Sequence, residues 1–263
     1  MAKAYNSYVK RDTFMENINP NVKIWAIFSF GLSAIIFPNI YLGLGLIVFL
    51  FILAFFSKLF KGFTKIMLGF GIPITLMLIF IHGFYGSKNE TILYDFGPVQ
   101  LGLEGVLHAL KIVSSLLVFL GTFYIMNHTT YTGKLVASLT ASGVNPKVGY
   151  LVLASLNVVP QMQRKLSVIQ EAQTARGVET KGSLWHRFKV FVPLLGPVVL
   201  SSLTDAQERG MTLETRGFGI KNVKQTHYVE VSYTKTDKII KYMLIGFFIV
   251  TLIITILMRL SVI

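Results

Sequence analysis

The sequence has no cysteine and few charged residues. None of its 263 residues carries a thiol, which excludes disulfide bonds, zinc–thiolate sites, iron–sulfur clusters and a cysteine nucleophile. Charged side chains make up 14% of the chain, against about 25% in a soluble domain. Because 53% of the residues are hydrophobic, the chain has too much apolar surface for a disordered protein and too few charges to cover a soluble one. The composition therefore indicates a membrane protein.

Acidic residues are scarcer than basic ones. The chain has 25 Lys and Arg against 12 Asp and Glu, a formal net charge of +13. The basic residues flank the apolar runs, which favours contact with anionic lipid headgroups and acidic protein surfaces over nucleic acid. No nucleotide-binding P-loop, zinc-protease motif, nucleophile elbow or dinucleotide fingerprint occurs, and the histidines have no metal-ligand spacing. We expect no catalytic residue, metal site or cofactor in this chain.

Five apolar runs are candidate transmembrane helices. A membrane span needs about 20 mostly apolar residues. The candidate spans are Val22–Pro38, Tyr41–Ser57, Ile66–Tyr85, Leu101–Met126 and Lys238–Met258. No small-residue cleavage site follows the first run, so we expect a retained span and not a signal peptide. Lys and Arg concentrate before the first run, between the second and third, and after the fourth, so the positive-inside rule predicts a cytoplasmic N-terminus and an external C-terminus.

Residues 127–237 are too long for a linker and too charged to span the bilayer cleanly. The pattern predicts a short amphipathic helix over Thr132–Ser142 and two long helices over Lys147–Gly177 and Leu184–Arg216. Each long helix has an apolar first half, called its stem below, and a polar second half. The stems are Val148–Val159 and Phe188–Leu203.

The sequence therefore predicts an all-α, polytopic integral membrane protein with about five transmembrane helices and long amphipathic helices on the cytoplasmic side. We expect three parts along the chain. These are a membrane domain with about four spans over residues 1–126, a cytoplasmic-side domain with two long helices over residues 127–237, and a C-terminal transmembrane helix over residues 238–263.

The two long helices have similar endings. The first ends in Glu171 and Ala175-Arg176-Gly177, the second in Glu214-Thr215-Arg216-Gly217. An Arg in the last turn followed by Gly is common as plain helix capping. Two such endings on one side of the membrane favour a contact surface, because Arg grips a carboxylate with two parallel hydrogen bonds and Gly lets another backbone approach. Glu208-Arg209-Gly210 is a third candidate that spacing alone leaves open.

These features resemble EcfT, the transmembrane coupling subunit of energy-coupling-factor (ECF) transporters, which import vitamins and some metal ions in prokaryotes. The likeness covers most of the chain and is strongest from Leu135 to Gly219. Ala175-Arg176-Gly177 matches the first of the family's two Ala-Arg-Gly motifs, and Thr215-Arg216-Gly217 departs from the second at its first position only. Asn19-Pro20-Asn21-Val22-Lys23 is similar to the family's Pro-x-x-Lys start of the first span.

The resemblance implies partners and a mechanism. Two ABC-type ATPases in the cytoplasm each dock on one coupling helix, with Arg176 and Arg216 as contacts to acidic residues and Glu171 and Glu214 as supporting residues. A separate small membrane protein, the S component, captures a vitamin or other micronutrient and packs on the stems. The chain itself is then a scaffold without catalytic residues. The resemblance also implies that the chain resides in the prokaryotic plasma membrane, with its N-terminus and coupling region in the cytoplasm.

A stand-alone secondary transporter is the alternative function. Glu104, His108 and Lys111 share one helix face at the start of the fourth span, and ionisable residues in a span are often functional. Their place near the outer end favours instead a helix start whose charges face water or the protein interior. A membrane-embedded enzyme would need a converging catalytic set, and the sequence shows none.

Overall fold

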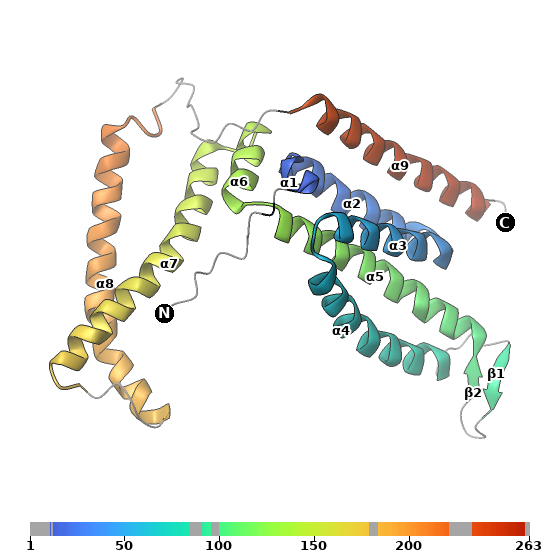
Figure 1. The fold of residues 1–263 in the computed structure, drawn as a ribbon, viewed down its shortest axis with the longest axis horizontal. Helices are drawn as coiled ribbons and strands as arrows, with labels where there is room; N and C mark the ends of the chain where they lie inside the picture. Colours follow the sequence, from blue (N-terminus) through green and yellow to red (C-terminus); the bar gives the residue numbers. More distant parts are fainter. Residues whose placement is uncertain are drawn as a thin grey trace. The chain divides into compact units, whose positions relative to one another are not determined.

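The computed structural model describes residues 11, 13–84, 91–95, 100–178, 184–220 and 233–260, which are almost entirely helical (Figure 1). The chain divides into two compact units. The bundle unit comprises Asn6–Ser138 and Glu230–Ile263, and the helix-pair unit is built around Leu139–Val229. The chain therefore leaves the bundle unit after Ser138 and returns to it at Glu230.

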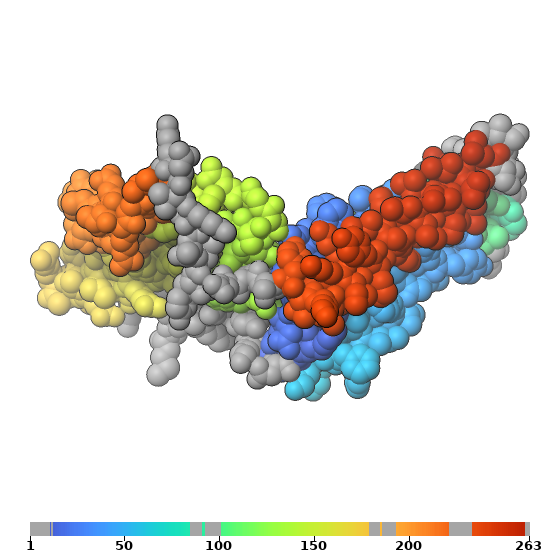
Figure 2. All heavy atoms as spheres, turned by 90° about the horizontal axis from the view of Figure 1, so that it is seen from above, coloured from blue at the N-terminus to red at the C-terminus, as the bar shows by residue number. Residues whose placement is uncertain are grey.

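The bundle unit is organised around one central helix, α5. Its helices are α1 (Phe14–Asn17), α2 (Pro20–Ile36), α3 (Ile40–Phe56), α4 (Phe60–Leu78), the π-helical turn η1 (Ile79–Phe84), α5 (Leu103–Thr129) and α9 (Lys235–Leu260). The helix α5 packs against α2, α3 and α4. The last helix, α9, packs against α2, and Figure 2 shows it in red along the blue α2.

Local sequence explains where α2 begins and ends. Asn19 caps α2 by accepting a hydrogen bond from the Asn21 backbone N–H at 3.0 Å, and Pro20 occupies the first helical position, where no N–H is needed. Pro38 disfavours helical backbone at the residue before it, so α2 ends at Ile36. This short break lets both α2 and α3 pack against α5.

The core of the bundle lies where α3, α4 and α5 meet. Phe63 of α4 is fully buried and meets Phe51 of α3 edge to face, with ring centroids 4.9 Å apart. Gly121 of α5 permits this close packing, because a Cβ atom there would lie 2.5 Å from the Met67 side chain. On the outer faces, large apolar side chains such as Phe55 are exposed, as expected where lipid surrounds the helices.

The predicted fold class is confirmed. Among the described residues, three helical segments are long and apolar enough to cross a membrane, Phe60–Phe84, Leu103–Thr129 and Lys235–Leu260, and α2 and α3 are shorter apolar helices. These elements correspond to the five predicted spans. The helix of the third span, α4, begins at Phe60 and not at Ile66 as predicted. Lys61 and Lys65, which the prediction places before the span, lie exposed on this helix. The aliphatic part of a lysine side chain can lie along apolar surface while its ammonium reaches water.

A short β-hairpin precedes α5. Its strands β1 (Ile92–Asp95) and β2 (Gln100–Gly102) pair antiparallel. No strand is predicted there from the sequence, because segments of three or four residues are too short to show an alternating pattern.

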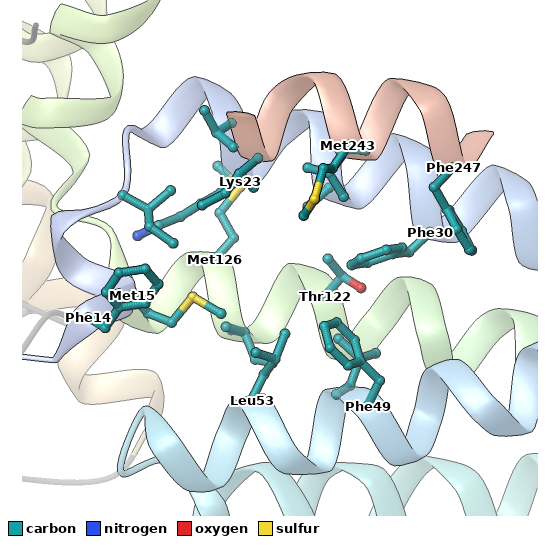
Figure 3. Close-up of a pocket in the computed structure, with 17 residues that line it drawn as sticks. Phe14, Met15, Lys23, Phe30, Phe49, Leu53, Thr122, Met126, Met243 and Phe247 are labelled. Carbon is teal, nitrogen blue, oxygen red and sulfur yellow. The ribbon is translucent and has the colours of Figure 1, made fainter. Parts of the chain in front are cut away.

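The helix α9 is attached to the bundle through α2. Ser29 Oγ donates to the Leu244 carbonyl at 2.7 Å, and the hydroxyl oxygens of Ser33 and Thr251 are 2.9 Å apart. Hydroxyls of this kind commonly join helices within a membrane. An apolar cavity of about 460 Å³ lies among α1, α2, α3, α5 and α9 (Figure 3). Its aromatic and methionine side chains are Phe14, Met15, Phe30, Phe49, Met126, Met243 and Phe247.

The helix-pair unit contains the two long predicted helices. Its elements are the end of α6 (Thr132–Ala141), α7 (Pro146–Ala175) and α8 (Leu184–Thr215). All three helices lie within two residues of the predicted ranges. The predicted division into a membrane domain, a coupling domain and a final span stays a prediction. The boundary between the two structural units falls inside α6.

Candidate functional site

The helices α7 and α8 form an antiparallel crossed pair (Figure 1). Lys165 of α7 forms an ion pair with Asp205 of α8 and donates to Ser201 Oγ at 2.6 Å. Near the start of α7, the Tyr150 ring lies 5.0 Å from the ring of Phe218, which follows α8. The start of α7 therefore lies beside the end of α8.

The crossing is held by polar side chains that the sequence analysis does not single out. Gln161 Nε2 donates to Asp205 Oδ2 at 3.2 Å, and Arg209 donates to Gln161 Oε1. These bonds join residues 40 or more positions apart, which leaves no local sequence pattern. Arg209 is thus used inside the helix pair, and Gly210 lies within α8. The third Arg-Gly candidate is part of the crossing and not a helix end.

The first predicted motif lies at the C-terminal end of α7. Arg176 is the C-cap of α7, and Gly177 follows with φ +86°. The Gly177 N–H donates to the Thr174 carbonyl at 3.0 Å, and the Val178 N–H donates to the Gln173 carbonyl at 3.1 Å. This pair of bonds is a Schellman ending, in which a left-handed residue satisfies the last carbonyls of a helix.

The second motif repeats this geometry at the end of α8. Gly217 has φ +71°, and its N–H donates to the Glu214 carbonyl at 2.9 Å. The Phe218 N–H donates to the Leu213 carbonyl, also at 2.9 Å. Thr215, which stands where the resemblance expects Ala, bonds its hydroxyl to the Thr212 carbonyl at 3.0 Å. The departure from the motif therefore leaves no unpaired hydroxyl at this helix end.

The backbone turn alone does not define a site, because α6 ends the same way. Gly143 has φ +108°, and the Val144 N–H donates to the Leu139 carbonyl at 3.2 Å. The residue before that glycine is Ser142 and not Arg. The feature that α7 and α8 share beyond plain capping is the arginine itself.

Both arginines are exposed and lie at opposite ends of α7. Among the described residues, neither guanidinium makes a hydrogen bond or an ion pair. Arg216 follows α8 beside the start of α7, and Arg176 follows the end of α7, whose 30 residues correspond to a length of about 45 Å. Glu171 and Glu214 are exposed near the respective ends. The helix pair thus presents two separate arginine ends.

A shallow polar groove lies beside the second arginine. It has a volume of about 350 Å³ and lies between α7 and α8. Its lining residues include Tyr150, Glu208, Arg209, Leu213 and Arg216. The stems carry exposed apolar side chains, among them Leu151 and Leu200. For the stem Phe188–Leu203, the side chains of residues 188–192 lie outside the described residues.

The ionisable face of the fourth span has a local structural role. Glu104 accepts hydrogen bonds from the Thr91 hydroxyl at 2.6 Å and from the Thr91 N–H at 3.2 Å. The ring of His108 lies 5.3 Å from that of His82. Glu104 therefore fixes the start of the hairpin to α5, at the end of the span and not in its middle.

Lys23 is a buried residue whose structural role the sequence analysis misses. Its ammonium donates to the Thr129 carbonyl at 2.9 Å, to Thr129 Oγ1 at 3.1 Å and to Thr130 Oγ1 at 3.0 Å. These contacts join the start of α2 to the end of α5. The Pro-x-x-Lys pattern singles out Lys23, but it carries no signal for partners 106 residues away.

Replacing the two capping glycines tests the helix endings. We expect Gly177→Ala and Gly217→Ala each to destabilise its helix end by about 1 kcal/mol, because an L residue at positive φ is strained. Gly210→Ala is the matched control, because Gly210 is helical and has no atom within 4 Å of an added Cβ. Ala in that helix interior should stabilise the chain by up to about 1 kcal/mol. Thermal unfolding followed by circular dichroism measures all three, and an equal loss in each would contradict the assigned endings.

Comparison with known proteins connects this site to a family. The family model described as CbiQ, cobalt transport protein, matches residues 11–228, which include both arginine ends. Similar proteins named energy-coupling factor transporter transmembrane protein EcfT come from several bacteria. The one from Leuconostoc gelidum subsp. gasicomitatum is 30% identical over 187 residues, 67% of each chain. The one from Staphylococcus aureus is 28% identical over 254 residues, 90% of this chain and 91% of the relative.

Proposed function

The chain belongs to the EcfT family of energy-coupling factor transporter transmembrane proteins, and from this membership we propose that it couples two cytoplasmic ABC-type ATPases to a substrate-capturing S component. It is a multi-pass membrane component of an ECF transporter, which works with other subunits. The ATPases, the S component and the uptake of a vitamin or other micronutrient are parts of the proposal.

The observation that carries the proposal is the duplicated arginine end. Arg176 and Arg216 occupy the same position in two identical Schellman endings, and both are exposed. A guanidinium recognises a carboxylate with two parallel hydrogen bonds, which fixes orientation as well as adding affinity. Two equivalent ends at opposite ends of α7 suit two equivalent partner subunits. Each ATPase would supply acidic residues to one arginine, with Ala175, Gly177, Thr215 and Gly217 shaping the contact.

The stems suit a membrane partner. Leu151 and Val159 on α7 and Leu200 on α8 are more than half exposed. Exposed apolar side chains gathered on a stem in this way suit an interaction site or a lipid contact. We assign it to the S component, which lies in the bilayer beside the stems. Movement of the ATPases on hydrolysing ATP would shift the helix pair and reorient the S component against it.

The chain's part in this mechanism is mechanical. It supplies no nucleotide site, and ATP hydrolysis belongs to the partners. In the proposed orientation, the N-terminus and the helix-pair unit lie on the cytoplasmic side, where basic residues are favoured. The ammonium groups of Lys61 and Lys65 at the start of α4 would lie on that same side.

Isolation of the intact complex tests the proposal. The tagged chain is purified from its native membrane in mild detergent, and mass spectrometry identifies the proteins that remain bound. We expect two ABC ATPase chains, or two copies of one, and one small membrane protein in stable proportion. Recovery of the chain without an ATPase would overturn the coupling function, whereas ATPases without a small membrane protein would overturn the role of the stems.

A further inference from the structure

Buried polar residues of the bundle unit lie close to the two places where the chain crosses between the units. The chain leaves the bundle unit after Ser138, which is on α6, and returns before α9, whose first turn contains Asp237. Asn19, at the start of α2, contacts both. Its side-chain Oδ1 accepts from Ser138 Oγ at 2.7 Å, and its backbone N–H donates to Asp237 Oδ1 at 3.0 Å.

These bonds are shielded from water. Asn19, Ser138 and Asp237 are 2%, 1% and 3% exposed, respectively. Hydrogen bonds in such surroundings do not compete with solvent and are stronger than exposed ones. The second oxygen of Asp237 accepts from the Thr234 N–H at 3.0 Å, which fixes the start of α9. Asn19, the N-cap of α2, therefore ties together α6, by which the chain leaves the bundle unit, and α9, the first helix after its return.

The helix α6 extends this connection into the other unit. It runs from Thr132 to Ala141, so its last three residues belong to the helix-pair unit. Lys23, four residues after Asn19 and on the same face of α2, holds Thr130 just before α6 begins. Lys134 of α6 also donates to the Glu16 carbonyl at 3.3 Å. Contacts at Thr130, Lys134 and Ser138 thus fix the direction of α6.

We propose that Asn19 is a positioning residue for energy coupling, which holds α6 in a fixed direction in the bundle unit so that movement of the helix pair reaches the bundle. The inference rests on the proposed function. A helix transmits movement only if its attachment does not bend, and Asn19 joins the two attachments in one buried network. Without the Asn19 side chain, α6 would turn about its junction and absorb the movement.

A second asparagine separates this role from helix capping. Asn145 caps α7 as Asn19 caps α2, with a proline following and a hydrogen bond of 3.0 Å from the N–H two residues on. Backbone angles are also alike, φ −57° and ψ 131° at Asn19 against φ −54° and ψ 126° at Asn145. Within the described ranges, the Asn145 side chain has only this local bond. Asn145→Ala therefore removes the cap alone, whereas Asn19→Ala removes the cap and the contact with Ser138.

The test measures movement between the units in the whole complex. Because the chain has no cysteine, spin labels can be placed at Gln163→Cys on α7 and Lys61→Cys on α4, both exposed. Double electron–electron resonance then gives the distribution of distances between the two spin labels, without nucleotide and with the non-hydrolysable analogue AMP-PNP. We expect AMP-PNP to shift the distribution in the labelled parent and in Asn145→Ala. In Asn19→Ala the distribution should broaden and the shift should be lost, while the ATPases still co-purify.

Each outcome decides the inference. A parent-like shift in Asn19→Ala would overturn it, as would an equal loss of the shift in Asn145→Ala. If Asn19→Ala does not fold, Ser138→Ala removes the same tertiary bond and keeps the Asn19 cap. Ser57→Ala is its control, because among the described residues the buried Ser57 hydroxyl, at the C-cap of α3, bonds locally to the Leu53 carbonyl. Absence of ATPases from the labelled parent is a different result, because it overturns the proposed function itself.

Discussion

The double substitution Arg176→Glu and Arg216→Glu is expected to release both ATPases from the complex and to abolish transport. Each change replaces a guanidinium by a carboxylate that would face the acidic residues of the partner. Loss of one partner of a buried, hydrogen-bonded charge pair costs about 2–5 kcal/mol of binding, which corresponds to about a 30-fold loss of affinity or more. Either single change should weaken one contact, and the pair should leave no stable complex.

Arg164→Glu is the matched control for this experiment. Arg164 lies on the polar half of α7, is exposed, and makes no ion pair among the residues that the structure describes. Arg209→Glu would be a poor control, because Arg209 bonds to Gln161 within the crossing of α7 and α8. The measurement is the amount of ATPase that co-purifies with each variant, followed by uptake of the substrate that the bound S component captures. A double variant that keeps its ATPases, or an Arg164→Glu variant that loses them, would contradict the arginine contacts.

The helices could be predicted because their signals are local. Apolar runs, Asn-Pro starts and Gly endings locate α2, α3, α7 and α8 to within two residues. The start of α4 is placed too late, since Lys61 and Lys65 resemble loop residues in a one-dimensional pattern. The hairpin is missed because its strands have three and four residues. Local sequence signals thus predict the helices, whereas elements that depend on contacts with other parts of the chain are not predicted.

The residues of the candidate site likewise divide into those that local sequence predicts and those that only tertiary contacts reveal. The two arginine ends are visible in sequence because Arg and Gly are adjacent at each helix end. The spacing could not separate Arg209 from Arg216, because the contact of Arg209 with Gln161 spans 48 residues. The Asn19 network spans 119 and 218 residues, and nothing near Asn19 signals it. Asn19 and Asn145 have the same local pattern, and only tertiary structure distinguishes them.

Lys23→Met is expected to destabilise the bundle unit by about 3 kcal/mol, the sum of a lost charge-assisted hydrogen bond and an unpaired buried acceptor. Methionine has nearly the same length and shape, so packing changes little. Replacement of a buried charge by an apolar side chain is often neutral when no polar partner is left behind. Here the Thr129 carbonyl at the end of α5 loses its donor. The Thr129 hydroxyl cannot replace it, because that hydroxyl already donates to the Ile125 carbonyl at 2.8 Å.

The loss should appear as a lower thermal midpoint of the purified chain and as faster proteolysis between α5 and α6. Lys61→Met is the control, because Lys61 is exposed and such surface changes usually stay within about 0.5 kcal/mol. The double variant Lys23→Met/Thr129→Val separates the contribution of the ammonium from that of the Thr129 hydroxyl. It also removes the Thr129 hydroxyl but still leaves the Thr129 carbonyl unpaired. We therefore expect it to be no more stable than Lys23→Met. A Lys23→Met protein as stable as the parent would mean that the ammonium only balances the cost of its own burial. In that case packing would stabilise the contact between the start of α2 and the end of α5, and the bonds of Asn19 to Ser138 and Asp237 would still join the start of α2 to α6 and α9.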